Sequence, residues 1–459
     1  MNAEGSVVQL TERGWIDGTL SRRLEAIAGL PGRSGPVVCL PDIHVKRGME
    51  APSSLATAFS NEVIPGLSSC SLNCGMGVVK SNLGASDLTP SAIGTFFRAF
   101  RRTARSGAWD LSHDELLDVV CRGFAPVADK YGFTADTVKR IENEGRLGRG
   151  LDRTDAELLL RGAAPAFIDR SRVKLGLSLG GNHFVEVQRI TRIHDRSLAS
   201  RWGLSEDQVL VMYHGGGGPV AGFMGRYYGN RTKDDARKRT RLFFRKLKYH
   251  FGNAEGWTHI AGRLRYFSPL AFTRHPADSA EGRRLVASII AGMNYGYAYR
   301  LAIASRIACA LTESFGGDGR ASVVYDVSHN SIQRQSIDGA EVWVHRHNAS
   351  RVDPDVALPL PGMFNSASYL VAAGSVPDRF LRSAPHGLGE LVSRDQQERS
   401  AEPLTTTTIR FDGSSDEPTT IPHVRSERVD AALERMDAEG LVRPVVELAP
   451  VAVLKGFRG

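Results

Sequence analysis

Four side chains of the metal-binding type, widely separated along the chain, constrain the fold more than any other feature of the sequence. Cys74 stands in an Asn-Cys-Gly turn, and His183, His214 and His329 each lie at or near the end of an apolar run of β type. Thiolate with imidazole is a borderline-soft ligand set that suits Mn, Zn, Fe or Co. One histidine at a strand end is usually structural, but the group favours a shared metal. Because residues so far apart meet only in the folded chain, we expect a catalytic metal centre closed by the whole fold.

The order of apolar and polar segments predicts a mixed α/β (α+β) protein. β-branched runs bounded by glycine or polar residues indicate buried strands, and functional groups often gather where such strands end. Helical patterns lie between these runs, and one of them is long and apolar. We therefore expect central β-sheets flanked by helices, with the metal site at the strand ends. The expected strands cover residues 37–40, 173–179, 209–213 and 323–325, and the expected helices cover residues 91–103, 154–161, 283–314 and 429–439.

The length of the chain allows a large core. Its 459 residues are 42% hydrophobic, and we see no internal repeat and no clear linker, so we predict a single domain over residues 1–459. The stretch 395–425 is the poorest in apolar residues and contains four consecutive threonines and the sequence Gly-Ser-Ser-Asp. We expect a surface loop or insertion there.

The charge balance favours a polyanionic partner. The formal net charge is +8, a modest excess for this length. Residues 231–250 hold nine Lys or Arg against Asp234 and Asp235, with Phe243, Phe244 and Tyr249 interleaved. Such a run is either a solvated helix face or a surface that binds the RNA backbone, and the sequence does not separate the two.

Cysteine usage and apolar runs indicate the compartment. The five cysteines form no paired framework, and an odd count fits a reducing environment. The start of the chain has no basic segment followed by an apolar one, and no apolar run approaches the roughly 18 residues of a membrane span. We expect a soluble, cytoplasmic protein.

Further motifs are ambiguous when taken singly. The glycines 215–218 are either a turn or a backbone cradle for phosphate, although no Walker or Rossmann glycine pattern is present. The small residues of the segment 361–369 suit a helix start that binds an anion or a simple cap and turn. His386 has small neighbours, so it is sterically open for a nucleophile or general base.

Taken together, the motifs resemble those of the RtcB family of RNA ligases over nearly the whole chain. The resemblance implies the family's own α/β fold and a GTP- and Mn-dependent ligase with one or two Mn²⁺. It implies that RNA ending in a 2′,3′-cyclic phosphate or 3′-phosphate is joined to RNA with a 5′-hydroxyl through a histidine–GMP intermediate, in RNA repair or tRNA splicing. The matching blocks follow one order: Asn73–Met76, Gly181–Glu186, the glycine loop after His214, Asp326–Asn330, His345–Arg351, Pro361–Tyr369, His386–Arg394 and the terminal Val453–Gly456.

The resemblance also implies a role for individual residues. Cys74 would bridge two metals, with His214 and His329 completing one site and His183 the other. His386 would be the nucleophile that carries GMP. The residues that match guanylate-binding positions of the family are Asn182, Glu186, Ser368, His386 and Lys455.

Three positions depart from the family pattern. Ser71 replaces an aspartate ligand, which should weaken the second metal. Gly218 and Glu390 stand where the family carries arginine, so two bidentate phosphate contacts are missing, each worth about 1.5–3 kcal/mol. These departures keep two alternatives open: an RNA-binding protein that has lost ligation, and a metal-dependent phosphodiesterase acting on RNA ends. Restoring arginine at both positions would test whether ligation is merely weakened.

Overall fold

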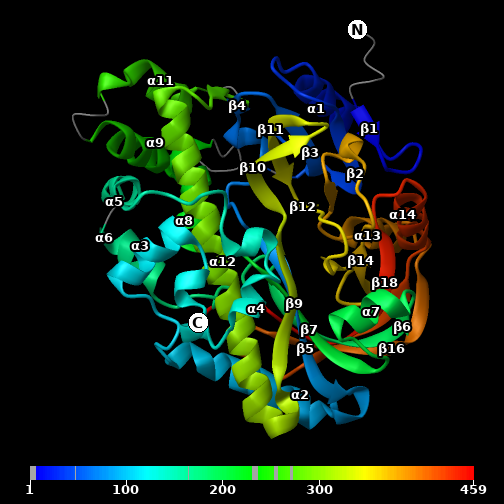
Figure 1. Ribbon diagram of the computed structural model, residues 1–459. Helices are drawn as coiled ribbons and strands as arrows, with labels where there is room; N and C mark the ends of the chain where they lie inside the picture. Colours follow the sequence, from blue (N-terminus) through cyan, green and yellow to red (C-terminus); the bar gives the residue numbers. More distant parts are fainter. Residues whose placement is uncertain (1–6, 47, 164, 230–235, 253–256, 269–271) are drawn as a thin grey trace.

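A large sheet forms the centre of the computed structural model, which describes residues 7–46, 48–163, 165–229, 236–252, 257–268 and 272–459 (Figure 1). Seven of its nine strands follow one path, and the hairpin of β16 (Glu402–Asp412) and β17 (Thr419–Arg425) joins it through β18. The path runs β13 (Leu358–Leu360), β14 (Ser368–Ala372), β18 (Arg443–Lys455), β6 (Phe184–Ile193), β7 (Gln208–Gly215), β5 (Gly75–Gly84) and β9 (Ala321–Ser328).

A second sheet of five strands lies beside the first. Its order is β1 (Val7–Gln9), β2 (Val37–His44), β3 (Ser53–Phe59), β11 (Ala340–His347) and β10 (Asn330–Ile337). Two short pairs complete the β-structure of the described residues: β12 (Ala349–Arg351) with β15 (Ser383–Pro385), and β4 (Glu62–Val63) with β8 (His275–Pro276).

The large sheet is buried on both faces, as β7 illustrates. Side chains alternate across a strand, and Val209, Val211 and Tyr213 belong to one apolar core. Leu210 and Met212 belong to a second core, which the smaller sheet shares. A strand buried on both faces has a continuous apolar sequence, which is why the run 209–213 was a clear strand signal.

One long helix, α12 (Ala280–Phe315), packs against the face of the large sheet that carries Val209, Val211 and Tyr213 (Figure 1). Helices α2 (Pro90–Arg102) and α3 (His113–Arg122) pack beside it. Helix α12 begins at Ser279, whose Oγ accepts a hydrogen bond from the N–H of Gly282 at 2.9 Å. Besides short 3-10 turns, the other described helices are α1 (Gly18–Ala28), α4 (Ala135–Val138), α5 (Arg153–Arg161), α6 (Pro165–Arg172), α7 (Arg196–Trp202), α8 (Gly218–Ala221), α9 (Ala236–Phe251), α11 (Ile260–Leu264), α13 (Gly389–Gln397), α14 (Glu427–Ala438) and a π-helical turn, η8 (Met224–Tyr228).

The mixed α/β class is confirmed, and so are the four expected helices and three of the four expected strands. The strand expected at 173–179 is wrong. Leu175, Leu177 and Leu179 are buried, as the alternation suggested. However, Lys174 and Gly176 have φ of 56° and 74°, and left-handed residues do not continue a strand. The backbone of Gly176 instead lies against α12, and the regular strand β6 begins only after His183.

The surface loop expected at 395–425 is also wrong for most of its length, because the segment contains the end of α13 and the hairpin β16–β17. Most of β16 is exposed, so the surface position is correct. The threonines belong to β16, and β-branched residues suit a strand even where they are polar. Whether the segment is an insertion, and whether the chain is a single domain, remain predictions.

None of the described helices combines the length and the apolar composition that a membrane-spanning segment needs.

Candidate metal centre and active site

Four strands bring the predicted metal ligands to one end of the large sheet. In the order β6–β7–β5–β9 every neighbouring pair is antiparallel, so the start of one strand lies beside the end of the next. Cys74 directly precedes β5 and His183 directly precedes β6. His214 is the penultimate residue of β7, and His329 directly follows β9. The four side chains therefore converge although the sequence separates them widely.

Cys74 lies at the centre of this group. Its Sγ is 3.3 Å from Nε2 of His183 and 3.3 Å from Nε2 of His214. The ring centroid of His214 is 4.9 Å from those of His183 and His329. Among the described residues, the ligand atoms of Cys74, His214 and His329 all lie within 4.8 Å of one another, close enough to share one ion.

Burial favours the uncharged forms of these ligands. It lowers the pKa of His183 to about 4 and those of His214 and His329 well below the usual value. It also raises the pKa of the Cys74 thiol to about 11. Nδ1–H of His214 donates to the main-chain oxygen of Asn182 at 3.1 Å, which leaves Nε2 with its lone pair free. Neutral imidazoles with a thiol that loses its proton on binding fit a divalent transition metal.

The second metal position has weaker support. His183 touches Cys74 but does not belong to the group whose ligand atoms all lie within 4.8 Å. Ser71 offers a hydroxyl where a carboxylate was expected, and its N–H donates to Ser69 Oγ at 3.3 Å. No carboxylate joins the group of ligands among the described residues. The geometry thus supports one position more strongly than the other.

A buried ion pair holds the turn that carries Cys74. Arg300 of α12 is fully buried, and its Nε donates to Asp326 Oδ2 at 3.2 Å. Its Nη1 donates to both oxygens of Asn73, and Tyr213 OH donates to Asp326 Oδ2 at 2.7 Å. Arg300 was not among the residues predicted from the sequence. The available signal was an isolated arginine inside an apolar helix, because a fully buried arginine is nearly always paired.

A buried carboxylate holds the turn that carries His329. Oε2 of Glu142 accepts from the N–H of Ser328 at 3.0 Å and from its Oγ–H at 2.6 Å. Tyr297 OH also donates to Oε2 at 3.2 Å, and Gln333 Nε2 donates to Oε1 at 2.7 Å. Glu142 was missed because nothing in its local sequence distinguishes it from an ordinary surface acid.

His386 lies next to the metal centre. It follows β15, and its ring centroid is 4.8 Å from that of His329. The ring is largely buried, with 16% of the side chain exposed, so the small neighbours do not leave it as open as the sequence suggested. Burial lowers the pKa of His386 to about 3. Nδ1 has no hydrogen-bond partner within the described part of the chain and lies 4.0 Å from Oδ2 of Asp42. Oδ1 of Asp42 accepts from the N–H of Glu390 at 2.8 Å.

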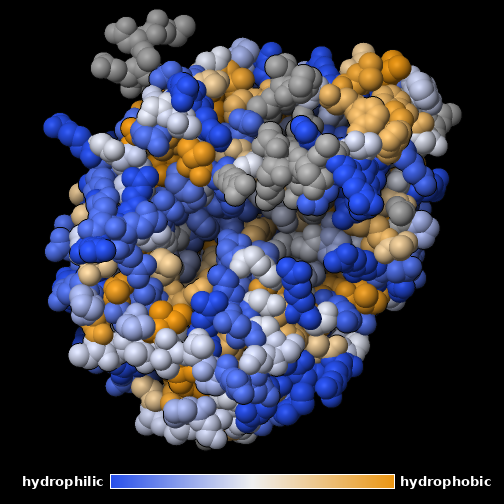
Figure 2. Space-filling view, turned by 180° about the vertical axis from the view of Figure 1, so that it is seen from behind, coloured by the Kyte–Doolittle hydropathy of each residue, from blue (hydrophilic) through white to orange (hydrophobic). Residues whose placement is uncertain are grey.

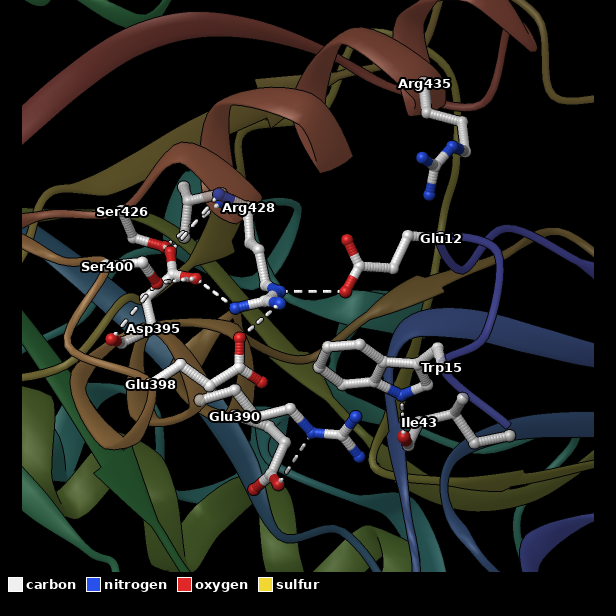
Figure 3. Close-up of polar contacts among 12 residues, drawn as sticks. Glu12, Trp15, Ile43, Glu390, Asp395, Glu398, Ser400, Ser426, Arg428 and Arg435 are labelled. Atoms are coloured by element: carbon white, nitrogen blue, oxygen red, sulfur yellow. Dashed lines mark hydrogen bonds and ion pairs between the residues drawn. The ribbon is translucent and has the colours of Figure 1, made fainter. Parts of the chain in front are cut away.

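Helix α13, which begins three residues after His386, is tied to its surroundings by Arg428 (Figure 3). This guanidinium contacts three carboxylates: Glu12 Oε1 and Glu398 Oε2, each at 2.8 Å, and Asp395. Ser426 Oγ–H donates to Asp395 Oδ2 at 2.5 Å. The network joins α13, α14 and the loop that carries Glu12. It therefore holds in place the helix that directly follows the segment carrying His386.

The predicted guanylate residues Glu186 and Lys455 lie on the neighbouring strands β6 and β18, where Lys455 pairs with Phe184. Nζ of Lys455 lies 4.7 Å from the ring centroid of Phe364. Phe184 contacts both Phe364 at 5.3 Å and His214 at 5.8 Å. Burial raises the pKa of Glu186 to about 8. Two ring contacts thus connect Lys455 to the metal centre.

Ser368 is buried at the start of β14, and its Oγ accepts from the N–H of Gly362 at 3.1 Å. The neighbouring Pro361 accepts through its main-chain oxygen from the N–H of Leu388 at 2.8 Å. Leu388 lies two residues after His386. The segment 361–368 therefore packs directly against the His386 loop and does not form the helix start that the sequence allowed.

Gly218 and Glu390, the two positions at which the sequence pattern led us to look for arginine, have different environments. Gly218 has φ of 73°, and an added Cβ would lie 2.5 Å from Tyr299 Cδ2 and 2.7 Å from Tyr295 Cε1. Glu390 lies in the first turn of α13 and is half-exposed, with Oε1 3.8 Å from Nε of Arg394. The side chain of residue 390 is thus partly open to solvent, whereas any side chain at Gly218 would meet two buried rings.

The chain is similar in sequence to splicing ligases named RtcB. The family model described as "tRNA-splicing ligase RtcB" matches residues 23–456. The tRNA-splicing ligase RtcB of Thermococcus kodakarensis is 28% identical over 417 residues, which cover 84% of this chain and 79% of that protein. The RNA-splicing ligase RtcB of Mycobacterium tuberculosis is 28% identical over 468 residues, which cover 94% and 99% of the two chains.

Proposed function

The chain belongs to the RtcB family of RNA-splicing ligases, and from this membership and its site we propose that it is a GTP- and Mn-dependent RNA ligase. It joins RNA ending in a 2′,3′-cyclic phosphate or 3′-phosphate to RNA with a 5′-hydroxyl, in RNA repair or tRNA splicing. The observation that carries the proposal is the unbroken series of ring contacts from His183 through His214 and His329 to His386. A nucleophile of the right kind thus adjoins a metal-binding group.

His386 acts as the nucleophile. Its pKa of about 3 leaves the imidazole neutral at physiological pH, so a ring nitrogen has a free lone pair. Asp42 faces Nδ1, which leaves Nε2 to attack the α-phosphorus of GTP. The new N–P bond forms as the bond to pyrophosphate breaks. The RNA 3′-phosphate then accepts GMP, and the 5′-hydroxyl displaces GMP to complete the joint.

Cys74, His214 and His329 would hold one Mn²⁺, and Cys74 with His183 the second. A bound divalent ion withdraws charge from the phosphate oxygens and so lowers the barrier to displacement. The part of the protein itself is to keep these ligands in place, through Arg300 beneath the Cys74 turn. The residues proposed to bind the guanylate are Asn182, Glu186, Ser368 and Lys455.

Two alternatives use the same site differently. A phosphodiesterase acting on RNA ends needs a metal-activated water and no histidine nucleophile, and an RNA-binding protein without ligation needs neither. Ser71, Gly218 and Glu390 favour these alternatives because each removes a charged contact. His386 beside His329, and Lys455 near the centre, favour the ligase.

Covalent labelling separates the three functions. With Mn²⁺ and α-labelled GTP, the protein should acquire label that is acid-labile and base-stable. His386→Ala should abolish this label and leave the metal content unchanged. His423→Ala, which removes a histidine hydrogen-bonded to Thr406 and Thr408 in the hairpin β16–β17, is the matched control and should retain the label. Label that persists on His386→Ala would place the nucleophile elsewhere, and metal-dependent cleavage of RNA ends without label would identify the phosphodiesterase.

A further inference from the structure

We propose that the outer face of α9, together with α11, is a docking surface for single-stranded RNA. The proposal rests on the proposed function in one respect, because it takes RNA as the substrate of the neighbouring centre. It adds a separate surface that holds the strand away from the reacting ends. Three observations carry it: how α9 is anchored, which side chains it exposes, and what charge it carries.

One stripe of α9 is anchored to the rest of the described chain by hydrogen bonds and ring stacking. Lys246 Nζ–H donates to the main-chain oxygen of Tyr266 at 2.9 Å, and the buried His250 contacts the oxygen of Tyr227 through Nε2 at 2.8 Å. Tyr249 stacks on Tyr227 with ring centroids 3.9 Å apart. Lys246, Tyr249 and His250 lie three and four residues apart, which is one face of a helix. The described side chains on the other faces are almost all exposed.

Most of the large apolar side chains that are exposed on the described surface lie on α9 and on the segment that includes α11. Ten large hydrophobic side chains are exposed in the described part of the chain, and six of them lie between residues 243 and 264. All three exposed aromatic residues, Phe243, Phe244 and Trp257, are among these six. Phe267 lies 5.5 Å from Phe243 and 6.1 Å from Phe251, which is 5.2 Å from Trp257, so the rings form one run. Figure 2 shows this apolar patch at the upper right, over α9 and α11, beside hydrophilic surface.

The charge on α9 has a single sign. The helix contains seven Lys or Arg and no Asp or Glu. Arg237, Arg241 and Arg245 are exposed four residues apart, and like charges at this spacing destabilise a helix. A solvated helix face usually mixes both signs. A polyanion relieves the repulsion, and exposed rings between cations are how proteins hold single strands, because bases stack on the rings while phosphates meet the cations.

Buried contacts connect α9 to the loop that carries Cys74. Tyr227 of η8 anchors α9 through Tyr249, and Gly225 of η8 donates its N–H to the main-chain oxygen of Cys70 at 2.9 Å. Cys70 lies four residues before Cys74. The same η8 follows the glycine loop after His214 along the chain. RNA docked on α9 therefore rests on an element that contacts the Cys74 loop.

Binding of a labelled oligouridylate over a series of salt concentrations tests the proposal. The triple variant Arg237→Gln, Arg241→Gln, Arg245→Gln should bind more weakly, and the slope of log K against log salt should fall by roughly 2, about 0.7 for each phosphate contact. Phe244→Ala should lower affinity by about tenfold, the loss of one stacked base, with the slope unchanged. Duplex RNA, whose bases are already stacked, should be insensitive to Phe244→Ala.

Matched controls carry equal changes elsewhere. Arg196, Arg201 and Arg443, exposed around α7, are replaced together by Gln, and the exposed Leu404 of β16 is replaced by Ala. Both controls should bind as the unaltered protein does. An equal fall in slope in the control triple, or no effect of Phe244→Ala, would overturn the proposal. So would an α9 triple that binds RNA normally but no longer sediments with vesicles of anionic phospholipid.

Labelling with GMP on the same preparations separates this proposal from the proposed function. The α9 variants should acquire covalent GMP as the unaltered protein does, because the guanylate residues lie elsewhere. If the unaltered protein takes no label while the α9 triple still shows the reduced salt slope, the ligase proposal fails and the docking surface stands. If label forms but the salt slope is unchanged in the α9 triple, the docking surface fails and the ligase stands.

Discussion

Gly218→Ala should destabilise the protein by about 2–5 kcal/mol. The residue has φ of 73°, and a left-handed conformation costs a residue with a Cβ about 1–2 kcal/mol. The new Cβ would also lie 2.5 Å from Tyr299 Cδ2 and 2.7 Å from Tyr295 Cε1, on two buried rings. Overpacking of this kind costs about 1–3 kcal/mol. The sum is a large share of the roughly 5–15 kcal/mol that stabilises an ordinary domain.

Urea unfolding followed by tryptophan fluorescence measures the loss, and Gly339→Ala is the matched control. Gly339 has φ of 76° but no atom within 4 Å of an added Cβ, so its substitution should cost only the backbone contribution of about 1–2 kcal/mol. The difference between the two variants isolates the contact with the tyrosines. Equal losses would refute the packing argument. Gly218→Arg should lose at least as much stability as Gly218→Ala.

Three further predictions concern the centre and its surroundings. The protein should retain nearer one Mn²⁺ than two after gel filtration, and Cys74→Ala should retain none, as elemental analysis measures; two tightly held ions would mean that another group replaces the carboxylate missing at Ser71. Burial lowers the pKa of His345 to about 3, with Nε2 accepting from Ile64 N–H at 2.9 Å, so below about pH 6.5 the unfolded chain takes up a proton that the folded one does not. The contribution of His345 alone to stability should therefore fall by about 1.4 kcal/mol per pH unit between about pH 6.5 and pH 3, and urea unfolding of His345→Gln should lack this part of the slope. Glu390→Arg should raise GMP labelling by adding a donor near phosphate, and unchanged or lower labelling would show that the site no longer uses an arginine there.

Local periodicity accounts for what the sequence predicted of the fold. The long helix α12 and the strand β7 each have a continuous apolar pattern, because both are buried on nearly all sides. The run 173–179 has the alternation of a strand, yet Gly176 turns the backbone against α12, a contact that no local pattern reveals. The β16–β17 hairpin was missed for the opposite reason, since its polar, exposed strands pair without an apolar signature.

In the candidate site, too, residues with a local sequence motif could be predicted, and residues defined by tertiary contacts could not. Cys74 and the three metal-type histidines each stand in a recognisable local motif, so their chemistry could be predicted from the sequence. The residues that support them could not. Arg300 and Glu142 act through partners on other elements, Asn73 and Ser328, and only the tertiary structure pairs them.

The two missing arginines are different kinds of change. At Gly218 the neighbouring rings of Tyr295 and Tyr299 fill the space that a side chain would need, so the loss of arginine is built into the packing around it. Glu390 is half-exposed, and its carboxylate lies 3.8 Å from Arg394, so one substitution there can be accommodated without repacking. Restoring arginine at both positions together would mix a folding defect with a change in phosphate binding. Glu390→Arg alone isolates the phosphate contact, whereas the packing at Gly218 supports a phosphate site rebuilt around its absence.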